Sequence, residues 1–204
     1  MRVTLIASIF GLAVAAAGLA AAPARAVDFP DLFVAWSPDF PDNAILTADN
    51  ASTGKSPRGP WECGGKNIAP AISWSRAPAD ARSFAVLMDD PDAALGRGGN
   101  HWIVYGVPPT AKGLARGAAE GPETFVAGDS GRLGAYHGAC AEPGAKAHHF
   151  IFYVYALTIG PGDLPRGLTK EQFMEKVRDK RTAEASIVAR YQRNADGSAF
   201  VETK

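Results

Sequence analysis

Hydrophobic residues in this chain fall into short runs that are separated by segments rich in Pro, Gly and Asp. The runs Ser83–Met88 and Trp102–Val107 are apolar on both faces of an extended strand, which predicts two central strands of one sheet. Shorter strands are expected at Val34–Trp36, Ala44–Leu46 and Ala71–Trp74. The first three quarters of the chain therefore predict β structure.

The segment from His148 to Leu157 has the clearest strand pattern of the chain. His148 and Phe150 fall on one face of this strand, and His149 and Ile151 fall on the other. The two adjacent histidines therefore point in opposite directions, which disfavours joint ligation of one metal ion.

The C-terminal part changes to a helical period. Thr169 and Gln172 have the spacing of a capping box, which predicts a helix that begins after Thr169. Ala183–Tyr191 is interpreted as a second helix, with Ile187 and Tyr191 on one side. The predicted fold class is β-dominated (all-β or α+β), with helices at one edge.

The connection between the two central strands carries the densest cluster of chemically active side chains. Asp89, Asp90 and Asp92 lie within it, and His101 opens the next strand. Pro91 fixes its own φ and holds the acidic cluster at a stiff strand end. Loop acids often cap turns, and this is the role expected for Asp89 and Asp92.

Two long stretches are predicted to be irregular loops. Ala48–Pro60 is rich in Ser, Thr, Gly and Asn, and Thr110–Gly144 is rich in Gly and Ala. Long irregular loops in compact domains are often binding elements. Asn50 begins a glycosylation sequon, which matters only in a host that glycosylates.

The first 26 residues have the organisation of a secretory signal peptide. Met1-Arg2 is followed by an Ala-rich apolar stretch, and Ala24-Arg25-Ala26 fits the cleavage rule. The alternative is a retained transmembrane anchor, but no cationic stop-transfer flank follows the stretch. The expected mature chain, 27–204, is a single periplasmic or secreted domain without a transmembrane anchor.

Charge excludes one class of partner. The chain has 21 basic and 21 acidic residues and a formal net charge of zero, and its basic residues are not clustered. Nucleic acid is therefore not an expected partner.

The two cysteines, Cys63 and Cys140, have two interpretations. In an exported protein an even pair predicts a disulfide, and this one would close a long loop and stabilise the fold by about 4 kcal/mol. The alternative is a pair of buried free thiols.

Several segments together resemble the phosphatidylethanolamine-binding protein family, in its bacterial and archaeal Raf kinase inhibitor-like branch. The matching segments occur in the family's order and extend from about Trp36 to Arg193: Cys63–Trp74, Ser83–Val86, Asp90–Ala93, His101–Tyr105, Gly138–Cys140 and His148–Leu157. The resemblance implies a large central antiparallel sheet packed on a smaller sheet, with C-terminal helices.

The resemblance also implies a small pocket for phosphate-like groups or a phospholipid headgroup. Carried over by motif, this pocket uses Asp90, His101 and His148, with the backbone near Gly138, and requires no cofactor. Asp90 is expected to accept a hydrogen bond from an imidazole and so to fix its tautomer. This chain departs from the family pattern at Glu142, which adds an acid to the pocket loop.

Three other functions are alternatives. A hydrolase could use an Asp and two His, but no Gly-x-Ser-x-Gly nucleophile motif is present. A metal site built from Asp90, Asp92, His101 and His148 lacks a His-x-x-x-His spacing. An extracytoplasmic interaction protein or peptidase inhibitor would bind an unknown protein partner through the pocket rim and the long loops.

Overall fold

The computed structural model describes residues 32–56, 59–118, 125–126 and 136–200. All of these residues belong to one compact unit, Asp31–Lys204. The predicted signal peptide and its cleavage site lie outside the described residues.

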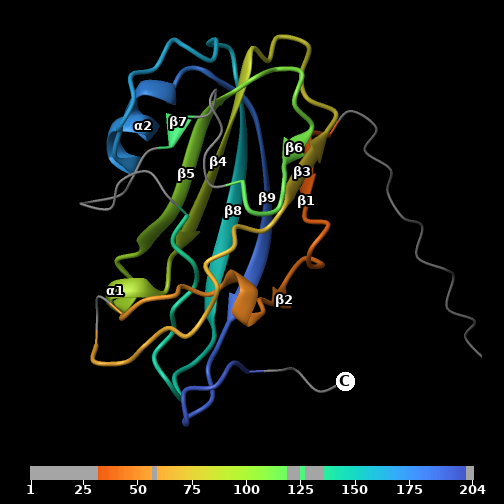
Figure 1. Cartoon of the computed structure of the whole chain (residues 1–204). Helices are drawn as coiled ribbons and strands as arrows, with labels where there is room; N and C mark the ends of the chain where they lie inside the picture. Colours follow the sequence, from red (N-terminus) through yellow and green to blue (C-terminus); the bar gives the residue numbers. More distant parts are fainter. Residues whose placement is uncertain (1–31, 57–58, 119–124, 127–135, 201–204) are drawn as a thin grey trace, which may run out of the picture. The chain divides into compact units, whose positions relative to one another are not determined.

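Two β-sheets dominate the described part of the chain (Figure 1). The larger sheet has the order β2-β9-β8-β4-β5-β7, with bounds Ala44–Ile45, Arg181–Tyr191, His148–Leu157, Ser83–Asp90, Gly99–Val107 and Phe125–Val126. The smaller sheet has the order β1-β3-β6, with bounds Val34–Trp36, Ile72–Ser75 and Gly113–Leu114. Neighbouring strands are antiparallel except β2, which is parallel to β9. The predicted fold class is confirmed.

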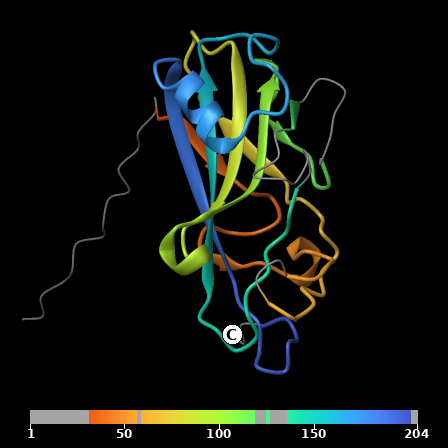
Figure 2. The same cartoon turned by 90° about the vertical axis from the view of Figure 1, so that its left-hand side faces the viewer.

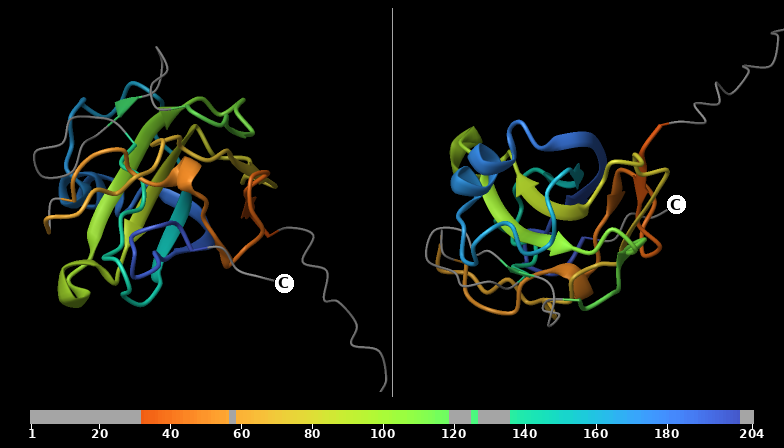
Figure 3. Two further views of the ribbon diagram at one scale, coloured as in Figure 1. Left: turned by 60° about the horizontal axis from the view of Figure 1, so that its bottom comes forward. Right: turned by 90° about the horizontal axis from the view of Figure 1, so that it is seen from above.

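The large sheet is buried on both faces. On one face, Phe150, Phe152 and Val154 of β8 belong to a core that includes Trp74 of the small sheet. The opposite face packs against α2 (Lys170–Val177), which inserts Phe173. Figure 2 and Figure 3 show α2 lying along this second face. This arrangement explains why the strands β4 and β5 are apolar on both faces.

The helix predicted from the capping box is confirmed. The Thr169 side chain accepts a hydrogen bond from the Gln172 backbone N–H, and the Gln172 side chain accepts one from the Thr169 backbone N–H. α1 (Ala93–Gly96) and the 3₁₀ helix Ala48–Asn50 complete the helical content of the described residues. None of these helices combines the length and the apolar composition that crossing a membrane requires.

The second predicted helix is wrong, because Arg181–Tyr191 forms strand β9. This strand pairs with β8 over its whole length, from His148 opposite Tyr191 to Leu157 opposite Arg181. Ile187, Ala189 and Tyr191 are buried, and the residues between them are more exposed. Burial thus follows a period of two, and the long ladder with β8 overrides the helical propensity of Ala and Glu.

The predicted long loops are mostly irregular where they are described. Thr110–Gly144 contains the short strands β6 and β7, and its residues 119–124 and 127–135 lie outside the described ranges. Asn50 is 4% exposed and donates a side-chain hydrogen bond to the Ile68 carbonyl. The sequon is therefore inaccessible in the folded chain.

Candidate functional site

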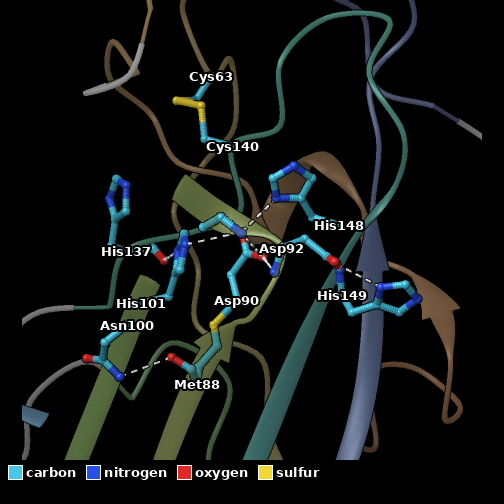
Figure 4. Close-up of polar contacts among 11 residues, drawn as sticks. Cys63, Met88, Asp90, Asp92, Asn100, His101, His137, Cys140, His148 and His149 are labelled. Atoms are coloured by element: carbon cyan, nitrogen blue, oxygen red, sulfur yellow. Dashed lines mark hydrogen bonds and ion pairs between the residues drawn. A yellow bond between two sulfur atoms is a disulfide. The ribbon is translucent and has the colours of Figure 1, made fainter. Parts of the chain in front are cut away.

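Three strand ends bring the predicted site residues together. β4 ends at Asp90, β5 begins at Gly99, and β8 begins at His148. Because β5 and β8 are both antiparallel to β4, these ends lie at the same edge of the large sheet. Figure 4 shows His101 and His148 approaching Asp90 from two sides.

Asp90 is the centre of this arrangement. The residue is 3% exposed, and its Oδ2 accepts a hydrogen bond of 2.8 Å from His148 Nδ1. Its Oδ1 accepts from the backbone N–H groups of Asp92 at 3.0 Å and Ala93 at 3.1 Å. The buried carboxylate is thus held by three hydrogen bonds, as a buried charge requires.

His101 reaches the same carboxylate from β5. Its Nε2 lies 3.9 Å from Asp90 Oδ2, and its Nδ1 lies 2.9 Å from the His137 carbonyl oxygen. A carbonyl oxygen can only accept, so Nδ1 carries the ring proton when His101 is neutral. The His101 ring also packs edge-on against Phe150, with 5.1 Å between the centroids.

These contacts fix where protons can be added. Nδ1 of His101 donates to a carbonyl, and Nδ1 of His148 donates to the Asp90 carboxylate. The Nε2 atoms of both rings therefore become donors only when the rings are protonated. The three side chains carry a net charge of −1 with neutral imidazoles and +1 with both imidazoles protonated.

The other acids of the cluster do not face this carboxylate. Asp92 precedes α1 but makes no side-chain capping bond, and its Oδ2 accepts from the backbone N–H and the Nδ1 of His149, both at 2.8 Å. Asp89 accepts from Lys170 Nζ at 2.7 Å. The expected turn-capping roles of Asp89 and Asp92 are therefore wrong. The backbone hydrogen bond from His149 lowers the pKa of Asp92.

The predicted disulfide is confirmed. Cys63 and Cys140 are bonded, with 5.2 Å between their Cα atoms. The bridge attaches the loop of residues 138–143, called the pocket loop below, to the segment around Cys63, which follows the 3₁₀ helix. Glu142, which would oppose an anion if it pointed inward, is exposed.

Gly138 lies where only a glycine fits. A Cβ atom at this position would come within 2.4 Å of the Asn50 carbonyl oxygen and 2.6 Å of the Ser52 backbone nitrogen. The Gly138 N–H donates to Asn67 Oδ1 at 2.8 Å. The contact of Gly138 with a ligand remains a prediction.

Sequence reasoning missed His137 and Asn67. The His137 ring stacks on His101 with 5.4 Å between centroids, and its Nδ1 lies 3.4 Å from Ser52 Oγ. His137 lies in a Gly-rich stretch without periodicity, so its only signal was that the chain has just four histidines. Ser52, the hydroxyl beside it, is 4% exposed.

The described side chains include no group of three or more His, Cys, Asp or Glu residues arranged to hold a metal ion. The Asp90 cluster is held by protein hydrogen bonds, with a ring nitrogen directed at the carboxylate. Its geometry thus fits proton and hydrogen-bond chemistry.

Comparisons with known proteins agree with this architecture. A family model described as phosphatidylethanolamine-binding protein matches residues 36–192. The chain belongs to this family. A UPF0098 protein of Aquifex aeolicus is 36% identical over 140 residues, which cover 66% of this chain and 80% of that protein. The putative lipoprotein LppC of Mycobacterium tuberculosis (strain H37Rv) is 34% identical over 132 residues, 65% of this chain and 64% of that protein.

A solved structure shows the same fold. The crystal structure of YbcL from Escherichia coli, described as a member of the mammalian PEBP family, superposes with a TM-score of 0.70 and 26% sequence identity. The superposition covers 78% of this chain and 98% of the YbcL chain. The predicted family resemblance is confirmed.

Proposed function

We propose that this chain is an extracytoplasmic binding protein whose pocket, formed by Asp90, His101 and His148, takes a small anion with phosphate-like oxygens. The observation that carries the proposal is the convergence of two imidazoles on one buried carboxylate, with both Nδ1 atoms engaged by protein acceptors. Family membership supports a binding role, since the family is described as phosphatidylethanolamine-binding.

Anion binding at such a site is coupled to proton uptake. With both imidazoles neutral, the site has a charge of −1 and offers lone pairs, so an anion is repelled. Protonating His101 and His148 reverses the charge to +1 and gives each Nε2 a proton to donate. Asp90 then compensates part of the imidazolium charge and holds the His148 ring in place. Affinity should therefore rise as the pH falls and the two imidazoles take up protons.

The size of this effect follows from linkage. Each proton taken up with the anion changes the affinity by about tenfold per pH unit in the range where the free site is unprotonated. Uptake of one to two protons thus predicts roughly a 10- to 100-fold gain in affinity for each unit by which the pH falls within that range.

A thermal-shift titration tests the function. The mature chain is titrated with phosphate, phosphoethanolamine and acetate, beside the variants His101→Ala and His148→Ala. Ligands that bind the native state raise its unfolding midpoint by mass action. We expect a rise with phosphate and phosphoethanolamine that both variants lose. A rise that both variants retain would place the anion elsewhere.

Three observations support the extracytoplasmic location. The first 26 residues have a signal-peptide pattern, Cys63 and Cys140 form a disulfide, and one relative is named a putative lipoprotein. N-terminal sequencing of the exported chain should find Val27 as the first residue. An unprocessed chain in the cytoplasm, with both cysteines reduced, would contradict the location.

A protein-binding role at the pocket rim is the second candidate. Leu95 lies in α1, which follows Asp90, and its side chain is 97% exposed at a positive φ of 60°. An exposed leucine in a costly backbone conformation suggests a contact residue. Inhibition assays with serine and cysteine peptidases, comparing the mature chain with Leu95→Ser, test this role. The protein-binding role predicts that the mature chain inhibits a peptidase and that Leu95→Ser weakens this inhibition.

A further inference from the structure

The ring proton of His101 depends on one carbonyl group. His101 and His137 exchange two hydrogen bonds: the His137 backbone N–H donates to the His101 carbonyl at 2.9 Å, and His101 Nδ1 donates to the His137 carbonyl at 2.9 Å. Neutral imidazole can carry its proton on either nitrogen, so the orientation of the His137 carbonyl selects Nδ1. With this choice, Nε2 is the nitrogen directed at Asp90.

Asn67 fixes the orientation of that carbonyl. The His137 carbonyl and the Gly138 N–H belong to the same planar peptide unit. Asn67 Oδ1 accepts from this Gly138 N–H at 2.8 Å, and Asn67 Nδ2 donates to the Tyr136 carbonyl at 2.8 Å. The two ends of one amide thus hold the peptide groups on both sides of His137, and a rotation of either would break a bond to Asn67.

Asn67 is itself held from several directions. Its φ is +56°, a left-handed conformation that Asn tolerates better than most residues, and its backbone N–H donates to the Ala51 carbonyl at 2.7 Å. The same segment is attached to the pocket loop by the Cys63–Cys140 bridge. Asn67 therefore has a fixed position from which to orient the loop.

The contact on the other side of the loop adds to this support. Gly138 lies against the backbone of Asn50 and Ser52 so closely that it has no room for a Cβ atom. The peptide unit between His137 and Gly138 is thus enclosed by backbone on one side and bonded to Asn67 on the other.

We propose that Asn67 is a positioning residue for the anion pocket: through the peptide group between His137 and Gly138 it keeps the ring proton of neutral His101 on Nδ1 and directs Nε2 toward Asp90. The effect on anion affinity rests on the function proposed above, but the effect on the His101 tautomer does not. A merely structural Asn67 would stabilise the turn without selecting a tautomer.

The variant Asn67→Gly tests the proposal, because glycine keeps the positive φ and removes only the amide. Asn43→Gly is the matched control, since Asn43 also has a positive φ, of 63°, and lies in an exposed turn before β2. Ring ¹⁵N NMR above pH 7.5 reports the tautomer of each histidine, and sulfate titration reports affinity. Thermal unfolding and thiol titration check that both variants are folded and bridged.

We expect His101 to be protonated on Nδ1 in the native chain and in Asn43→Gly. In Asn67→Gly the Nε2–H tautomer should appear, and sulfate affinity, titrated at pH 6 and 7.5, should depend less steeply on pH, because neutral His101 can then donate from Nε2 without taking up a proton. The conservative variant Asn67→Asp keeps an acceptor for the Gly138 N–H, so it should retain the Nδ1–H tautomer. An Nε2–H tautomer in Asn67→Asp would overturn the proposal even if Asn67→Gly fails to fold.

An unchanged His101 tautomer in folded Asn67→Gly would overturn the proposal, as would an Nε2–H tautomer in the native chain. A tautomer change without any sulfate binding by the native chain would uphold the positioning role and overturn the anion function instead. The two failures are therefore distinguishable.

Discussion

Two Asp–His pairs lie at the same strand ends and differ mainly in their surroundings. Asp90 and His148 have side chains that are 4% and 25% exposed, whereas Asp92 and His149 are 43% and 50% exposed. Both pairs have a hydrogen bond of 2.8 Å between Nδ1 and Oδ2. In the buried pair a second imidazole, that of His101, lies with its Nε2 3.9 Å from the Asp90 carboxylate.

The alternation of β8 separates the two pairs. His148 and His149 are adjacent in sequence, and the strand directs them to opposite faces. The same hydrogen bond therefore has different consequences in the two pairs. Protonation of His148 changes the charge inside a buried pocket, whereas solvent screens the charges of the Asp92–His149 pair at the surface.

The largest expected effect comes from the bridge beside the buried pair. Replacing Cys63 and Cys140 by Ala removes a cross-link between residues 77 apart in sequence, which should lower the free energy of unfolding by about 4 kcal/mol. Urea unfolding of the double variant measures this loss. A decrease below about 1 kcal/mol would show that the bridge adds little to the fold.

The carboxylates of the two pairs, Asp90 and Asp92, should differ in how much they stabilise the fold. Asp90→Ala leaves two backbone N–H groups and the His148 ring without their acceptor in a buried site, so unfolding should become easier by about 3 kcal/mol. Asp92→Ala removes an exposed contact and should cost about 1 kcal/mol or less. Equal losses in urea unfolding would contradict the contrast between the pairs.

The two histidines should differ in anion binding. His148→Ala removes a charged donor from the pocket and should weaken sulfate binding by roughly 10- to 100-fold. His149→Ala, its neighbour on the other face, should leave the affinity unchanged. Calorimetric titration of both variants at pH 6 makes the comparison, and a loss in His149→Ala would move the site to the other face.

The smallest effect concerns acid stability. The pKa of Asp92 is lowered in the folded chain from its usual 3.8. Its contribution is therefore complete above pH 3.8 and is lost as the pH falls through the lowered folded value. As the pH falls below 3.8, the free energy of unfolding of Asp92→Asn should decrease less than that of the native chain, by a few tenths of a kcal/mol. If the native chain and Asp92→Asn lose stability identically with acid, the contact between Asp92 and His149 does not contribute to the pH dependence of stability.

Several strands and helix α2 were predictable because their signals are local. The alternation of β8, the apolar character of β4 and β5, and the capping box at Thr169 each determine structure within a few residues. The family resemblance then connected Asp90, His101 and His148, which are far apart in sequence.

The parts that were not predicted depend on distant contacts. β9 contains Ala and Glu, which favour a helix, and its strand conformation comes from pairing with β8. Ile187 and Tyr191 lie four residues apart, a spacing that places them on one side of either a helix or a strand. The roles of His137 and Asn67 arise from the two peptide groups on either side of His137, which hydrogen-bond to Asn67 about 70 residues away in sequence. No local pattern marks such a bond.

This pocket is expected to gain protons when it binds an anion. Sulfate is the suitable probe because it does not titrate near neutral pH, and calorimetry at pH 7.5 in two buffers of different ionisation enthalpy counts the protons. We expect an uptake of one to two protons per sulfate in the native chain and in His149→Ala, and sulfate binding roughly 10- to 100-fold weaker in His148→Ala. Sulfate binding without proton uptake would contradict proton-coupled anion binding at this pocket.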